Sequence, residues 1–223
     1  RVVGDGHPLS GWVWVAWQEY GTYDELIEDL TIIAPEEGIM VQHRLYAPKG
    51  GQGTTVVACA FALQQPGRTL LVDDRGDRAA ALGLPEPTTG VIVPVTDRLD
   101  LLVLYDRELP ATLPAEVLDS YDQYVGDYGT PTGLPDPRNI DTMVIRADYL
   151  ALRRAIGIRT PDRVVLIMEP GRALRPVDVA RSLGIPESNI TVVDIDPAIA
   201  RAVDAGLLAC RLPASLKGLA HHE

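Results

Sequence analysis

Short apolar segments alternate with segments of helical periodicity along most of the chain, from residue 39 onward. The apolar segments are nearly continuous, as in Val164 to Met168, which is typical of strands that are covered on both faces of a sheet. This alternation predicts an α/β fold with a doubly wound, mostly parallel sheet and helices on both faces. The predicted strands are 40–46, 69–73, 91–95, 99–105, 123–127, 141–146, 163–168 and 190–194. The predicted helices are 55–65, 114–121, 148–156, 176–183 and 197–205.

The beginning of the chain follows a different pattern, and we predict that residues 1–38 form an N-terminal extension to a main domain of residues 39–223. Residues 23–30 indicate a short acidic helix. A β-prone run before it holds all the tryptophans of the chain, Trp12, Trp14 and Trp17. Tryptophan is enriched at binding hot spots, so the extension either binds a protein partner or packs as a hairpin or edge strand on the main domain.

Composition and charge narrow the range of possible functions. The net charge of −11 opposes non-specific binding to DNA or to an anionic membrane, and the scattered arginines are typical of solvated helix faces. Residues 214–220 are too few for a membrane-binding helix. No run reaches the roughly 18–20 apolar residues of a membrane span, and the start does not read as a signal peptide. Cys59 and Cys210 are expected to be buried free thiols of a reducing compartment, which predicts a cytoplasmic protein.

A glycine-rich loop, Lys-Gly-Gly-Gln-Gly-Thr-Thr, spans residues 49–55 between a predicted strand and a predicted helix. This arrangement binds phosphate, because free backbone N–H groups and the helix dipole converge on one point. A P-loop usually ends in Gly-Lys-Ser/Thr, but Thr54 occupies the lysine position here. Lys49 is one of only two lysines, with Lys217, among 20 basic residues. Its compact ammonium suits a place beside phosphate, although a solvated loop lysine is the alternative.

Acidic residues follow two of the predicted strands. Asp73 and Asp74 end or follow the strand 69–73, and Asp127 ends the strand 123–127. Ligands of an open α/β sheet bind beyond these carboxyl ends. The Mg²⁺ of a P-loop nucleotide is held by a loop hydroxyl and a strand-end carboxylate, so we predict Thr55 and Asp127 as metal ligands. Asp73 or Asp77 is predicted to hold a metal-bound or attacking water. The alternative for each aspartate is a helix cap or a turn.

Three segments resemble, in this order, motifs of the ParA/MinD family of deviant Walker A P-loop ATPases. Residues 49–55 resemble its Walker A pattern Lys-Gly-Gly-x-Gly-Lys-Thr/Ser, residues 71–85 resemble its second motif and the Leu-Gly-Leu after it, and residues 121–130 resemble its Walker B segment. Residues 196–212 also resemble the closing region of the family. The resemblance covers residue 39 to the C-terminus. Within the family it is greatest to the CpaE/TadZ-like branch, which tolerates irregular Walker A loops and acts in pilus localisation and assembly.

The resemblance implies a P-loop NTPase-like fold and a homodimer whose subunits face each other across ATP or ADP with Mg²⁺. It implies that Lys49 reaches the phosphates of the partner subunit and that Asp73 lies near the attacking water, which makes these two the catalytic candidates. Thr55 and Asp127 match the metal ligands. The implied nucleotide-binding residues are Lys49, Gly50, Gly51, Gln52, Gly53, Thr54 and Thr55.

The chain departs from the family pattern at two positions. Thr54 replaces the lysine that contacts the phosphates within the same subunit, and losing such a charge-assisted contact costs about 1.5–3 kcal/mol of binding. Transition-state stabilisation suffers as well, because phosphoryl transfer relies on charge neutralisation. Arg75 and Arg172 are candidates to supply that charge. Glu169 follows the strand whose end often supplies an asparagine to adenine, which leaves the base specificity open.

We therefore expect a localisation, partitioning or pilus-assembly factor that binds nucleotide weakly or not at all and works through protein partners. One alternative is an active dimeric ATPase that uses Lys49 in trans and is at most a slow Mg²⁺-dependent enzyme. Another is a structural interaction module that does not use nucleotide.

Overall fold

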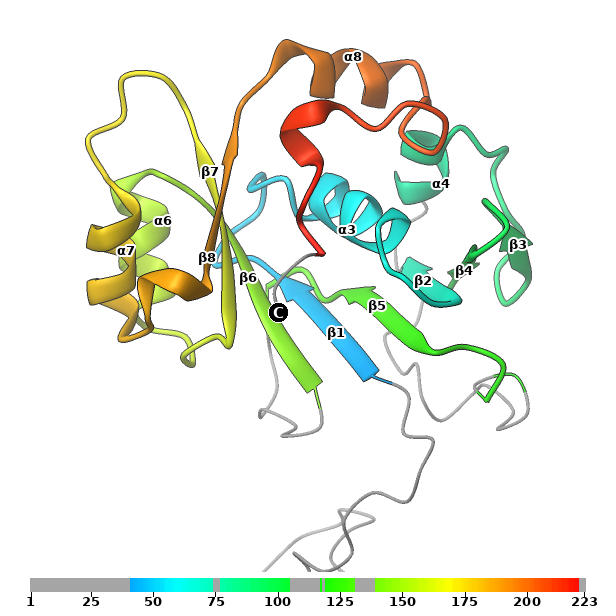
Figure 1. Cartoon of the computed structure of the whole chain (residues 1–223), viewed down its shortest axis with the longest axis horizontal. Helices are drawn as coiled ribbons and strands as arrows, with labels where there is room; N and C mark the ends of the chain where they lie inside the picture. The colour runs from blue at the N-terminus through cyan, green and yellow to red at the C-terminus, as the bar shows by residue number, and fades with distance from the viewer. Residues whose placement is uncertain (1–40, 74–76, 105–116, 118, 131–138, 221–223) are drawn as a thin grey trace, which may run out of the picture. The chain divides into compact units, whose positions relative to one another are not determined.

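The computed structural model describes residues 41–73, 77–104, 117, 119–130 and 139–220 (Figure 1). These residues lie in the unit Met40–Glu223, one of the two into which the chain divides. The predicted N-terminal extension with its tryptophans lies outside the described residues, as does most of the predicted helix 114–121. The boundary at residue 38 therefore stays a prediction.

The described part of the chain is built on one eight-stranded sheet, with the strand order β3-β4-β2-β5-β1-β6-β7-β8. Neighbouring strands are parallel except β3 and β4, which pair antiparallel at one edge. The strands are β1 (Val41–Tyr46), β2 (Thr69–Asp73), β3 (Ile92–Pro94), β4 (Leu99–Val103), β5 (Gln123–Asp127), β6 (Asn139–Arg146), β7 (Arg163–Met168) and β8 (Ile190–Asp194).

Helices cover both faces of this sheet (Figure 1). They are α3 (Thr54–Leu63), α4 (Asp77–Leu82), α6 (Tyr149–Ala155), α7 (Pro176–Leu183) and α8 (Pro197–Asp204), with 3₁₀ turns η1 (Glu187–Asn189) and η2 (Ala214–Leu216). The predicted α/β fold is confirmed, and each predicted strand has a counterpart. Helix α4 was not predicted, because six residues are too few to establish a helical period. Among the described residues, no helix has the length and apolar character needed to span a membrane.

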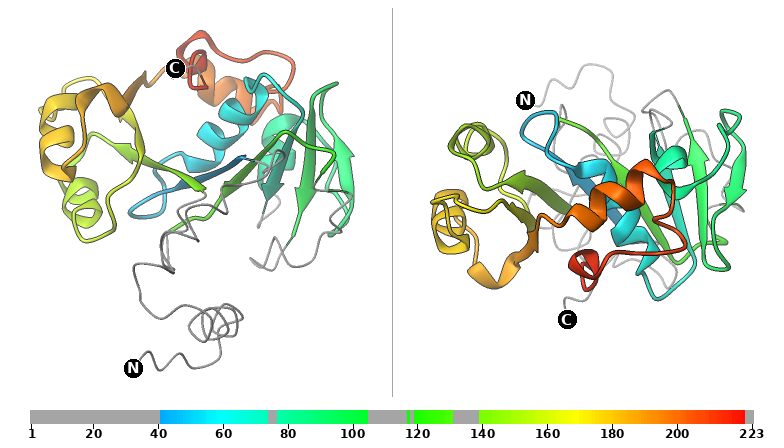
Figure 2. Two further views of the ribbon diagram at one scale, coloured as in Figure 1. Left: turned by 60° about the horizontal axis from the view of Figure 1, so that its bottom comes forward. Right: turned by 90° about the horizontal axis from the view of Figure 1, so that it is seen from above.

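The core is divided by the sheet into a layer on each face. Strand β7 shows the alternation: Val165 and Ile167 pack with α3, α4 and α8, whereas Val164 and Leu166 pack with α6 and α7. Figure 2 shows α6 and α7 side by side at one end of the sheet, and α8 passing over α3. A third cluster, on the face opposite α3, joins β2, β4 and β5. Strands buried on both faces explain the nearly continuous apolar runs.

The two cysteines differ in their environments. Cys59 is fully buried in α3, and burial raises the pKa of its thiol to about 12. Cys210 is exposed, so the prediction of a second buried thiol is wrong. It lies in a turn after α8 where Leu208 fills the core, whereas Leu207 points outward. Apolar residues adjacent in the sequence therefore did not predict the burial of Cys210, because side chains in a turn point in different directions.

Candidate functional site

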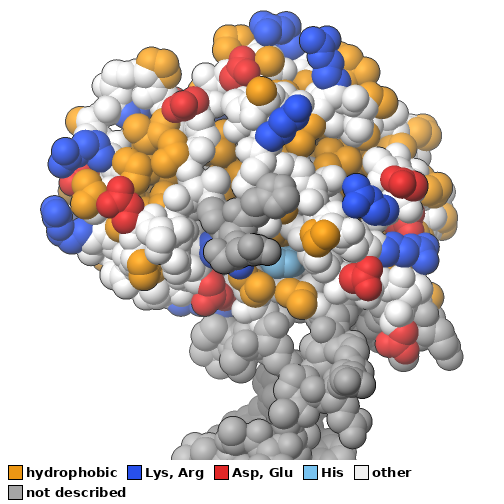
Figure 3. Space-filling model, in the orientation of Figure 1, with side chains coloured by type: hydrophobic (Ala, Val, Ile, Leu, Met, Phe, Trp, Pro, Cys, Tyr) orange, Lys and Arg blue, Asp and Glu red, His pale blue; other side chains and the backbone are white. Residues whose placement is uncertain are grey.

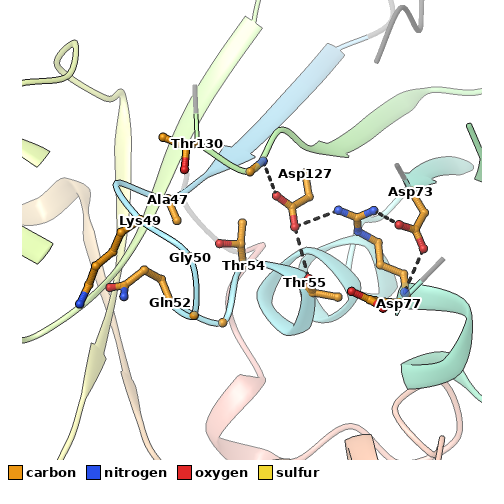
Figure 4. A pocket seen from close by; sticks show the side chains of 14 residues that line it. Ala47, Lys49, Gly50, Gln52, Thr54, Thr55, Asp73, Asp77, Asp127 and Thr130 are labelled. Atoms are coloured by element: carbon orange, nitrogen blue, oxygen red, sulfur yellow. Dashed lines mark hydrogen bonds and ion pairs between the residues drawn. The ribbon is translucent and has the colours of Figure 1, made fainter. Parts of the chain in front are cut away.

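The order β2-β5-β1 places three strand ends at one edge of the sheet. Asp73 ends β2, Asp127 ends β5, and the glycine-rich loop 49–55 lies between the end of β1 and the first turn of α3. Since the three strands are parallel, their carboxyl ends meet at the same edge. A pocket of about 290 Å³ lies there. Every residue predicted for the site, from the loop 49–55 to Asp73 and Asp127, lines this pocket (Figure 4).

The backbone of the loop leaves the start of α3 available to a ligand. Gly51 and Gly53 adopt left-handed conformations, with φ of 75° and 91°, which only glycine adopts without strain. Gly53 is the N-cap residue of α3 and has no side chain to offer, and the first turn of the helix contains no acidic residue. The first N–H groups of a helix lack partners within the helix and carry the positive end of its dipole. These groups belong to residues that line the pocket.

Gln52 anchors the loop to the neighbouring strand. Its side chain is buried, and its Oε1 accepts a hydrogen bond from the backbone N–H of Arg146 at 2.8 Å. Arg146 ends β6, which pairs with β1. The side chain of Gln52 therefore fixes the position of the loop.

Lys49 forms an ion pair with a residue of the same chain. Its Nζ lies 3.4 Å from Oδ2 of Asp148, whose Oδ1 accepts a hydrogen bond from the N–H of Ala151 and so caps α6. Burial opposes the charge of Asp148, but this hydrogen bond and Lys49 lower its pKa. The lysine points away from Thr55 and Asp127 (Figure 4). Its role toward a partner subunit stays a prediction, and sequence reasoning missed Asp148.

Thr55 and Asp127, the predicted metal ligands, are brought together. The Oγ1 of Thr55 lies 3.4 Å from Oδ2 of Asp127 and donates a long hydrogen bond to it. The other carboxylate oxygen, Oδ1, accepts a hydrogen bond from the N–H of Gly129 at 2.8 Å. Asp73 lies beside them with no exposed surface (Figure 4). Three of the four side chains predicted for catalysis and metal binding, Thr55, Asp73 and Asp127, thus share one wall of the pocket.

Arg78 was missed by sequence reasoning, and it joins the two aspartates. Its Nη2 lies 2.8 Å from Oδ2 of Asp127, and its Nη1 bonds to Oδ1 of Asp73. Its backbone N–H also donates to Oδ2 of Asp73, at 2.9 Å. Only 2% of the side chain is exposed, yet it lines the pocket. Burial opposes its charge, but Asp127 and Asp73 outweigh burial and raise the pKa of Arg78 above its usual value.

One signal in the sequence pointed to Arg78. It is the only long side chain between Asp77 and Leu82, in a stretch of three alanines that is otherwise apolar and small. From the sequence, Arg75 and Arg172 were instead the candidates to supply the missing positive charge. Arg75 lies outside the described residues, and Arg172 pairs with Glu169, its Nε lying 2.8 Å from the carboxylate Oε2. Glu169 also accepts from Arg146, at 2.9 Å.

The site fits a phosphate better than a divalent cation. The loop offers backbone N–H groups at a helix start, which suits phosphate. Mg²⁺ requires oxygen ligands at about 2.0–2.1 Å in nearly octahedral geometry. The Oδ2 of Asp127 already accepts from Thr55 and Arg78, and within the described part of the chain no group of three or more His, Cys, Asp and Glu side chains is arranged to hold a metal. As arranged, these residues do not fit a cation bound directly to Asp127.

Comparison with known proteins identifies similar solved structures. The ParA family ATPase from Chlorobium tepidum matches with a TM-score of 0.59 at 18% identity, covering 81% of this chain and 95% of that one. MinD from Aquifex aeolicus matches with a TM-score of 0.60 at 14% identity, covering 81% and 94%. The same protein in its MinC:MinD complex matches with a TM-score of 0.56 at 15% identity, covering 74% and 86%.

A plasmid partition protein from Borrelia burgdorferi bound to AMPPNP also matches, with a TM-score of 0.54 at 15% identity, covering 81% of this chain and 95% of that one. No protein-family profile matches the sequence, and no curated protein matches it. The identities are low, so these likenesses establish the fold and not the activity. The fold of this chain is the P-loop α/β fold of ParA and MinD ATPases.

Proposed function

We propose that this protein is a ParA/MinD-like localisation or partitioning factor that binds a nucleotide weakly through a degenerate Walker A loop. The observation that carries the proposal is the pocket itself, where the loop 49–55 presents the start of α3 beside Thr55 and Asp127. A loop that had lost phosphate binding would not need left-handed glycines and a helix start that no described side chain caps. The AMPPNP bound to the similar partition protein supports a nucleotide as the ligand.

Binding is expected to be weak because the loop lacks its usual lysine. Thr54 is buried at the first position of α3 and carries no charge. Lys49 is paired with Asp148. Hydrolysis is expected to be slow at most, since the carboxylate of Asp73 is buried and bound to Arg78. A carboxylate in that state is poorly placed to orient an attacking water.

A protein partner in the cytoplasm suits this role better than DNA or a membrane. On the face shown in Figure 3, the basic side chains of the described residues are spread among acidic and apolar ones and do not form a continuous basic patch. The similar MinD is known in a complex with another protein, MinC. We extend the proposal to a homodimer and to a contact through Trp12, Trp14 and Trp17, and the resemblance to the CpaE/TadZ branch suggests pilus assembly as the process served.

Titration calorimetry with ATP tests the proposal. We expect heat of binding at millimolar ATP, and binding about 10- to 100-fold tighter in Thr54→Lys, because a lysine at this position restores a charge-assisted contact to phosphate. Thr89→Lys is the matched control, since it adds the same charge at an exposed loop position outside the pocket. The proposal would be wrong if neither the natural protein nor Thr54→Lys bound ATP.

A further inference from the structure

A buried guanidinium lies where the metal of a P-loop site is expected. Arg78 touches both strand-end carboxylates, at 2.8 Å from Oδ2 of Asp127 and in direct contact with Oδ1 of Asp73. That Oδ2 is also the carboxylate oxygen nearest to the hydroxyl of Thr55. The guanidinium and the predicted metal therefore compete for the same oxygen.

Electrostatic repulsion favours the guanidinium over the metal in this competition. A Mg²⁺ on Oδ2 of Asp127, at its usual ligand distance, would lie within about 5 Å of Nη2 of Arg78. Two positive centres so close repel each other strongly where water is scarce. An arginine cannot lose its proton in a protein, so Arg78 cannot relieve the repulsion by becoming neutral. Moving it away would leave the buried carboxylate of Asp73 and the largely buried carboxylate of Asp127 without their cation.

The position of Arg78 in the chain holds it in place. Its backbone N–H donates to Oδ2 of Asp73 while its side chain returns to Oδ1 of the same carboxylate. Helix α4 begins one residue earlier and packs against α3 and α8 through Ala79, Ala81 and Leu82. The fold thus fixes the position of the guanidinium, whereas an arginine on the surface would be mobile.

We propose that Arg78 is the resident cation of this site and takes the place of the divalent metal, so that the pocket binds a nucleoside di- or triphosphate without Mg²⁺. This inference rests on the proposed function, since it concerns the same pocket. Backbone N–H groups of the loop hold the phosphates, and Arg78 offsets part of the charge of Asp73 and Asp127 that would otherwise repel them. One negative charge of the two carboxylates stays uncompensated, which agrees with weak binding.

Titration calorimetry of the natural protein with ATP, in EDTA and in millimolar Mg²⁺, tests the inference. We expect the two dissociation constants to agree within about twofold. Binding that Mg²⁺ tightens by more than about tenfold would overturn the inference and leave the proposed function intact. Absence of binding in both buffers would overturn both.

A double variant, Arg78→Met with Asp73→Asn, supplies the converse test. It removes one positive and one negative charge together, so the buried cluster keeps its net charge, and it frees Asp127 for a metal. We expect Mg²⁺ to tighten ATP binding by about tenfold or more in this variant. Arg98→Met with Asp97→Asn is the control, because it makes the same changes at two exposed neighbours outside the pocket.

An unchanged response to Mg²⁺ in the folded double variant would contradict the inference, since Arg78 would then not be what keeps the metal away. Near-ultraviolet circular dichroism establishes whether the variant is folded. If it is not, the comparison of the two buffers with the natural protein still decides the question.

Discussion

At the scale of single residues, the central finding is that an unpredicted arginine joins the two predicted aspartates. Asp73 and Asp127 were found from the sequence because each ends an apolar strand, a local pattern. Arg78 could not be found in the same way, because one of its two partners belongs to a distant strand and only the sheet order brings them together. Local patterns predict which residues point to the site edge, but they do not predict which charges pair there.

The buried ion pairs of Arg78 make it important for stability as well. We expect Arg78→Met to lower the free energy of unfolding by about 3–5 kcal/mol, because it leaves the buried Asp73 and the largely buried Asp127 without their cation. Urea unfolding measures this. Arg175→Met is the control, since that side chain is 72% exposed and its pair with Asp178 is a surface contact that should leave the midpoint unchanged. Equal midpoints for the two variants would show that the buried pairs do not stabilise the fold.

His43 makes stability depend on pH. Its side chain is buried in β1 against the ring of Phe61, and burial, with a smaller effect of Arg163, lowers its pKa to about 4 although Gln123 acts in the opposite sense. In the unfolded chain the group binds a proton near pH 6.5, so stability falls as the pH drops from about 6.5 to 4 and this loss stops below that range. The full effect is about 3 kcal/mol.

Urea unfolding of the natural protein and of His43→Gln, at several values between about pH 7 and pH 4, tests this account of His43. The natural protein should lose more stability over this range than the variant, in which the titrating group is missing. Parallel losses in the two proteins would mean that His43 does not contribute to the acid sensitivity.

At the scale of elements, two segments that resembled separate motifs of one family turn out to be packed together. Gly83 follows α4 and Gly206 follows α8, and both have positive φ, of 81° and 62°. A Cβ on Gly83 would lie 2.1 Å from the carbonyl oxygen of Gly206. The glycines allow the two helix ends to approach at backbone distance, which covers α3 from outside.

Gly83→Ala is therefore expected to destabilise the fold by more than the strain of a positive φ alone. The strain costs about 1–2 kcal/mol, and the overlap with Gly206 adds about 1–3 kcal/mol. Gly90→Ala is a matched control, because Gly90 has a φ of 77° but no atom within 4 Å of the added Cβ. Thermal or urea unfolding compares the two. Similar losses in both variants would show that the close approach does not matter.

The element scale also shows what the sequence could and could not predict. The strands are nearly continuous apolar runs, and β2, β5, β7 and β8 have the predicted bounds. Helix α4 was not predicted because its six residues are too few to establish a helical period of apolar positions. Its first turn carries Arg78, so the element that positions the cation was missed together with the cation.

At the scale of the whole molecule, the sheet order explains why the site is where it is. Placing β5 between β1 and β2 brings the loop, Asp127 and Asp73 to one edge, and the fold is that of ParA and MinD ATPases. The predicted fold is confirmed for this reason: parallel strands with a glycine loop after the first have few ways to assemble. The differences lie in side chains. Thr54 replaces the usual P-loop lysine, and Arg78 occupies the site although the sequence did not predict it there.

Deleting residues 1–38 tests the predicted division of the chain. Strand β1 begins at Val41 and lies inside the sheet between β5 and β6, so the main domain should fold without the segment before it. We expect the shortened protein to keep a cooperative thermal transition and to lose a protein partner if the tryptophans bind one. Aggregation or a non-cooperative transition would instead indicate that the segment completes the core.

The central claim is that the loop binds the phosphates of a nucleotide while Arg78 occupies the place of the metal. A crystal structure grown with ATP and Mg²⁺ tests this claim most directly. The account predicts phosphates on the backbone N–H groups of residues 50–55, with Arg78 still between Asp73 and Asp127 and no metal bound to either carboxylate. A Mg²⁺ bound by Thr55 and Asp127 with Arg78 displaced, or a loop without phosphate at saturating ATP, would contradict it.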